Sequence, residues 1–170
     1  MSGEPPAAPA SDEPPAPPTA ATGQADLGLL RLKDKVQRYL TDLVGSVELT
    51  PEGVFTFRAE STRLFVSCRP WEQTENTLVQ LIAPVLQGCE PTPELYKHIA
   101  THADDYLFGH LSAREDGDKL DILFTHTLLG DFLDPDELKR AVAGMIRSAN
   151  DLDDELKTRF GGSRFHEDQA

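Results

Sequence analysis

The chain has 170 residues, with 29 acidic and 16 basic side chains and a formal net charge of −13. A protein this acidic repels phosphate backbones and anionic lipid surfaces, and no basic stripe offsets the charge, so binding to nucleic acid or to a membrane is disfavoured. No run of about 18 apolar residues could span a bilayer. With two cysteines, no CxxC motif and no signal-peptide pattern, we expect a cytoplasmic protein.

Residues 1–26 contain seven of the 13 prolines and no aromatic, lysine or arginine side chain. A segment of this composition has too little apolar surface to offset the entropy lost on ordering. We therefore predict three parts: a disordered, acidic Pro/Ala-rich arm over 1–26, one domain over 27–162, and a flexible tail over 163–170.

The first half of the domain changes its hydrophobic period from helical to strand-like. Apolar residues recur at helical spacing over 27–44, and Gly45 offers a stop, which predicts a helix. Residues 54–60 and 63–69 then alternate apolar and polar side chains around a short polar turn, which predicts a hairpin. Residues 47–49 could add one short strand before it.

The middle of the domain predicts a strand and a short helix. Residues 77–86 fit either a strand or a buried helix, but Pro84 would break a helix, so we predict a strand with this proline at an edge or a bulge. Thr92 as cap and Pro93 at the first position predict a helix that ends near Asp104.

The last part of the domain predicts a second hairpin and a long helix. Asp116-Gly117 is a strong turn signal between strands over 107–114 and 119–129. Asp134 and Glu137 fit a capping box at the start of the helix. Its apolar stripe repeats like a heptad and needs a continuous partner, either a sheet or another helix. The stripe consists of Leu138, Val142, Met145, Ala149, Leu152 and Leu156.

The element order α–β–β–β–α–β–β–α predicts an α+β domain with a mostly antiparallel, five-stranded sheet. Helices should cover one face of this sheet. The other face is partly apolar and needs cover from a helix, a second subunit or a peptide. Its expected residues are Phe65, Leu78, Ile82 and Leu123. Trp71, the only tryptophan, is either a core or rim anchor or a hot spot of a partner interface.

Candidate chemistry in the sequence is sparse. His98 and His102 lie four apart on a helix, but the Glu of a metalloprotease helix is missing. Cys68 should face inward and has no activating neighbour in sequence. The acids of 150–155 lie inside the last helix, where they should face solvent. No P-loop, dinucleotide or nucleophile motif occurs. We expect no enzyme, no metal and no cofactor, with a metal-dependent enzyme using the two histidines as the remote alternative.

Several short stretches resemble the YbjN-domain family of actinobacteria, which is related to the CesT-like class I type III secretion chaperones. These stretches are Thr62–Val66, Thr77–Val79, Ala83–Leu86, Thr92–Leu95, Phe108-Gly109, His126–Asp131, Leu133–Leu138, Asp151–Leu156 and Arg159–Gly162. The resemblance covers about 27–162 and supports the fold more than any activity. It implies a non-enzymatic, chaperone-like module, typically a homodimer, that binds a protein or peptide client.

Our leading hypothesis is that a client binds to the apolar sheet face and to a sheet edge. The edge would supply main-chain hydrogen bonds and apolar pockets would select side chains. The expected partner-binding residues are Phe65, Trp71, Leu78, Ile82 and Leu123. A regulatory or structural protein with one obligate partner is the alternative, with the Pro-rich arm as a tether.

Overall fold

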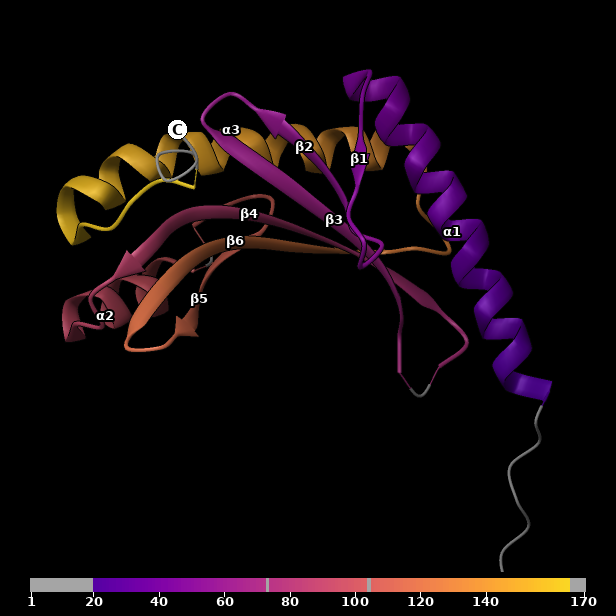
Figure 1. Cartoon of the computed structure of the whole chain (residues 1–170), viewed down its shortest axis with the longest axis horizontal. Coiled ribbons are helices and arrows are strands. Elements are labelled where there is room, and N and C mark those ends of the chain that lie inside the picture. The colour runs from indigo at the N-terminus through magenta and orange to yellow at the C-terminus, as the bar shows by residue number, and fades with distance from the viewer. Residues whose placement is uncertain (1–19, 73, 104, 166–170) are drawn as a thin grey trace, which may run out of the picture.

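The computed structural model of the protein describes residues 20–72, 74–103 and 105–165, with side chains from Leu27 onward (Figure 1). The expected α+β class is confirmed, with six strands rather than five because residues 48–49 form the short extra strand. In chain order the elements are α1 (Ala20–Val44), β1 (Glu48–Leu49), β2 (Phe55–Ala59), β3 (Thr62–Pro70), β4 (Thr77–Cys89), α2 (Pro93–His102), β5 (His110–Asp116), β6 (Lys119–Leu129) and α3 (Pro135–Phe160).

The first helix is longer than expected. α1 begins at Ala20 rather than Leu27 and ends at Val44, followed by Gly45 with a φ of 80°. Residues 1–19, most of the expected arm, and residues 166–170 of the expected tail lie outside the described residues. None of the described helices is long and apolar enough to cross a membrane.

The strands form one antiparallel sheet in the order β1-β2-β3-β4-β6-β5. Both expected hairpins are present. In the second, Asp116 pairs with Lys119, so the turn is Gly117-Asp118 rather than Asp116-Gly117. This moves the register by two residues: a turn centred on Asp116-Gly117 would place His110 opposite Leu123, whereas His110 pairs with Thr125.

β4 is the long central strand of the sheet and carries Pro84 in its interior. Pro84 pairs with Leu123 on β6, and the register shifts directly after it, so Leu86 is the next residue in the ladder. The expected bulge is therefore present, and Pro84 also lies past Ile82, the last residue of β4 that pairs with β3, so both expected features occur at this position. Because proline has no backbone N–H to donate, the register break falls where a regular ladder is hardest to continue.

α1 and α3 pack on the same face of the sheet. Figure 1 shows α3 running along the sheet, α1 crossing one end of it and α2 at the other end. All six residues of the predicted apolar stripe on α3 are buried, so its continuous partner is the sheet. From the sheet, the core receives Leu64 and Val66 on β3 and Val79, Leu81 and Ala83 on β4.

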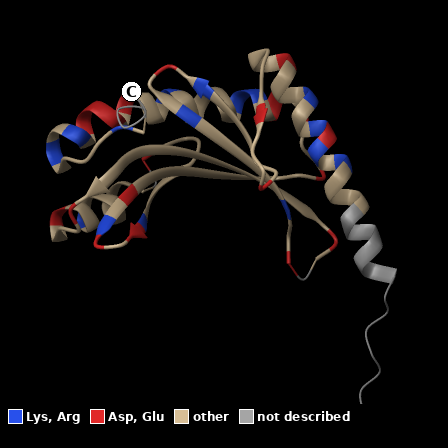
Figure 2. Cartoon of the chain, in the orientation of Figure 1, with Lys and Arg blue, Asp and Glu red and all other residues tan. Residues whose placement is uncertain are grey.

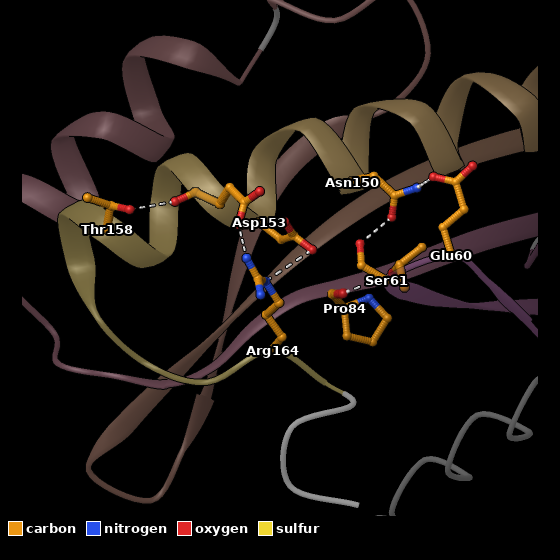
Figure 3. Close-up of polar contacts among 9 residues, drawn as sticks. Glu60, Ser61, Pro84, Asn150, Asp153, Thr158 and Arg164 are labelled. Carbon is orange, nitrogen blue, oxygen red and sulfur yellow. Dashed lines mark hydrogen bonds and ion pairs between the residues drawn. The ribbon is translucent and has the colours of Figure 1, made fainter. Parts of the chain in front are cut away.

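The acidic end of α3 does not simply face solvent, as the sequence suggested. Asn150 accepts a hydrogen bond from Ser61 (2.6 Å) and donates one to Glu60 (2.7 Å), which ties the β2–β3 turn to the helix. Asp153 is buried and forms an ion pair with Arg164, which follows the helix (Figure 3). The β2–β3 turn and the segment after α3 therefore pack against the part of α3 that the periodicity predicted to be exposed to solvent.

Candidate functional site

The sheet face opposite α1 and α3 contains an apolar hollow of about 270 Å³, which we call the open-face hollow. It lies over the middle of β3, β4 and β6, and no described helix packs on it. Its apolar lining consists of Val54, Phe65, Ile82, Pro84, Leu123 and Phe165.

Strand register brings the apolar side chains of the hollow together. Phe65 on β3 pairs with Ile82 on β4, and Pro84, two residues further on the same face, pairs with Leu123 on β6. Side chains two apart on a strand share a face, so residues from three strands form one continuous apolar floor. Leu123 is 9% exposed, whereas Phe65 and Ile82 are half-buried and line the opening.

A polar pair closes one side of the hollow. Arg114 on β5 donates to Asp121 on β6 at 2.8 Å, and the second carboxylate oxygen of Asp121 accepts from the backbone N–H of Gly88 at 3.3 Å. Asp121 is buried, so these partners offset the cost of removing its charge from water. The hollow therefore has an apolar floor and a charge-balanced wall with a guanidinium at its rim.

The five residues expected to bind a partner fall into two groups. Phe65, Ile82 and Leu123 line the open-face hollow. Trp71 and Leu78 instead line a second, more polar hollow of about 560 Å³ at the β3–β4 connection. The expected continuous patch is thus divided, because Leu78 pairs with Arg69 near the far end of β3.

One aromatic residue of the site has no signal in the strand and helix patterns of the sequence. Phe165 belongs to the segment that had been assigned to a flexible tail, and its ring lies edge-on to Phe65 with 5.7 Å between ring centroids. Its contribution depends on how the chain turns after α3, and the strand and helix periodicities carry no information about that turn.

His98 and His102 lie on α2 and Cys68 lies on β3, so the sequence candidates for chemistry belong to separate elements. His98 and His102 stack with 4.3 Å between centroids, and Arg159 lies 3.1 Å from Nδ1 of His98. Among the described residues, no group of three or more His, Cys, Asp or Glu side chains could hold a metal ion. Burial raises the pKa of Cys68 to about 11, which keeps this thiol protonated near neutral pH.

The comparisons with known proteins agree with this architecture. A family model described as "T3SS (YopN, CesT) and YbjN peptide-binding chaperone 1" matches residues 31–168. The chain belongs to this family of peptide-binding chaperones. The resemblance noted in the short sequence stretches is thereby confirmed, and with it the assignment to a peptide-binding class.

Solved structures share the fold of this chain at low sequence identity. A chain of the ExsC–ExsE complex is 16% identical, with a TM-score of 0.55, and the match covers 74% of this chain and 96% of that one. YbjN from E. coli is 10% identical, with a TM-score of 0.54, over 75% of this chain and 93% of that one. No curated protein matches the sequence.

Proposed function

We propose that this chaperone-family protein is not an enzyme and binds an extended segment of a client protein in the open-face hollow and along the neighbouring edge of β4. The observation that carries the proposal is the hollow itself, an apolar depression on the sheet face that α1 and α3 leave uncovered. Phe65, Ile82 and Leu123 would contact the client directly. Trp71 and Leu78 would extend the contact toward the second hollow.

The chemistry of the surface suits a polypeptide ligand. β4 carries no charged residue, and Figure 2 shows the middle of the sheet largely free of charge while α1 and α3 carry many charges. An apolar floor beside a partly open strand lets main-chain hydrogen bonds supply affinity and the hollow select a side chain. The net charge of −13 favours clients that are not acidic. ExsC, a fold relative, was crystallised in a complex with ExsE, which supports a protein client.

Selection of short random peptides against the intact protein tests this proposal. Bound peptides should lose affinity by about tenfold or more when Ile82→Asp places a charge in the hollow, because burying an unpaired carboxylate is costly. Leu107→Asp is the matched control, since it adds the same charge at a side chain that is 91% exposed and outside the hollow. That control should bind like the unaltered protein.

Circular dichroism and thermal unfolding separate loss of binding from loss of folding. If Ile82→Asp unfolds the domain, Ser67→Glu replaces it, because Ser67 lines the same hollow without contributing apolar burial. Peptides that bind all variants equally would reject the proposal for this site. Several unrelated bound sequences would favour a chaperone, and a single sequence class would favour one obligate partner.

A further inference from the structure

The segment after α3 turns back onto the sheet through two glycines. Gly161 and Gly162 have φ angles of 71° and 79°, a region that favours glycine. A Cβ on Gly162 would lie 2.7 Å from the carbonyl oxygen of Gln87, closer than packing allows. This pair of glycines therefore brings residues 163–165 beside the end of β4.

Ser163 pairs with β4 as an added strand would. Its N–H donates to the carbonyl of Gln87 at 2.9 Å, and its carbonyl accepts from the N–H of Gln87 at 2.8 Å. The last β3–β4 pair in the ladder is Phe65 with Ile82, so the end of β4 extends past its β3 neighbour. Ser163 satisfies backbone groups that would otherwise form an open edge.

The side chains of Arg164 and Phe165 point to opposite faces of the sheet at this edge. Arg164 reaches α3 and forms ion pairs with Asp153, at 3.4 Å, and with Asp154 (Figure 3). Phe165 lines the open-face hollow and packs on Phe65 with an interplanar angle of 84°. Alternation along an extended chain explains why neighbouring residues separate into an ionic contact and an aromatic one.

We propose that residues 163–165 act as an internal ligand of the client site, and that the client is an extended segment in which a basic residue directly precedes an aromatic one. This inference rests on the proposed function and names its ligand class. The chain offers such a client three contacts: a main-chain pair at Gln87, the carboxylates of Asp153 and Asp154, and the apolar floor under Phe165. A client gains them only by displacing Ser163-Arg-Phe.

The internal ligand weakens binding of every external one. A tethered segment competes at an effective concentration that reaches the millimolar range for short flexible linkers. Phe165→Ala removes the aromatic contact of the competitor and leaves the apolar floor from β3, β4 and β6 unchanged. Phe132→Ala is the matched control, because this phenylalanine is 78% exposed and does not line the hollow.

Peptide selection followed by fluorescence anisotropy tests the inference with the full chain. Peptides selected on the Phe165→Ala variant should be enriched in Arg or Lys directly before Phe, Tyr or Trp. They should bind this variant at least about tenfold more tightly than the unaltered protein or the Phe132→Ala control, because the competitor is weakened. Asp154→Lys, at a side chain that is 78% exposed, should remove the preference for the basic residue without unfolding α3.

The outcomes separate the inference from the function on which it rests. Peptides that bind the unaltered protein and the Phe165→Ala variant equally, or that lack the basic–aromatic pair, would overturn the internal ligand and leave a client site in the hollow. If no peptide binds any form of the protein, both the inference and the proposed function fail.

Discussion

Gly144 shows at the scale of one residue how α3 accommodates the loop before β5. A Cβ at this position would lie 2.5 Å from the ring of Phe108. In an exposed helix, replacing glycine by alanine stabilises the fold by about 1 kcal/mol. Here the added methyl group would collide with an aromatic ring that packs against the core, and overpacking typically costs about 1–3 kcal/mol.

We therefore expect Gly144→Ala to destabilise the protein by roughly 1 kcal/mol, measured by urea denaturation, because the steric cost exceeds the helical gain. In a Phe108→Ala background the same substitution should stabilise, since the ring is gone. Stabilisation in both backgrounds would show that the loop moves aside without cost.

His98 makes the second prediction at the residue scale, which concerns pH. It is 5% exposed and is packed against His102, Arg159 and Phe160, with Glu155 and Asp105 as the acids that face it. Burial first, and then the neighbouring His102 and Arg159, lower the pKa of His98 below 6.5 in the folded protein. Folding therefore favours the neutral form of the His98 ring.

Stability should decline as the pH falls below 6.5, because His98 then becomes protonated in the unfolded chain while it stays neutral in the folded chain. Above that pH the contribution is fully present, and it is lost as the pH falls through the lowered pKa. His98→Gln should flatten this dependence in denaturation experiments and leave the part that comes from His126, whose pKa is also lowered by burial. An unchanged pH dependence in His98→Gln would contradict the assignment.

At the scale of elements, α3 is the best-specified part of the fold. Asp134 accepts a hydrogen bond from the backbone N–H of Glu137 at 2.8 Å, and Pro135 occupies the first helical position, as expected. The reciprocal bond of a capping box, from the Glu137 carboxylate to the cap, is not among the contacts of the described residues. Of the two hydrogen bonds in the predicted capping box, the one accepted by Asp134 therefore fixes the start of α3.

Removing this cap should destabilise the protein by about 1 kcal/mol, because Asp134→Ala leaves an N–H at the helix start without its acceptor. Asp136→Ala is the matched control. It removes an acid from the same first turn and the same favourable interaction with the helix dipole, but no capping bond, so its loss should be a few tenths of a kcal/mol. Equal losses in chemical denaturation would mean that charge, rather than the hydrogen bond, stabilises this end.

At the scale of the whole molecule, the expected homodimer stays a prediction. The apolar stripe of α3 is buried against the sheet and is not available for an interface between subunits. Large apolar side chains remain exposed elsewhere, and Leu27 and Leu30 on α1 and Leu49 on β1 are each more than half exposed. Exposed apolar surface of this kind often marks an interface between subunits.

Light scattering during gel filtration should report about twice the 18.7 kDa chain mass at tens of micromolar protein, because association would cover these apolar side chains. A mass of one chain at that concentration would reject the homodimer. The measurement is independent of peptide binding and does not bear on the open-face hollow.

Local patterns in the sequence determined nearly every element, the α+β class and the buried side of α3, because hydrophobic period, capping residues and turn residues act within a few positions of the chain. They also placed Phe65, Ile82 and Leu123 on the face opposite the core. Only the tertiary structure decided that Leu78 lies apart from them, that Asp153 is buried, and that Phe165 completes the hollow. Those facts depend on strand register and on the chain returning after α3, and contacts between distant residues leave no period in the sequence.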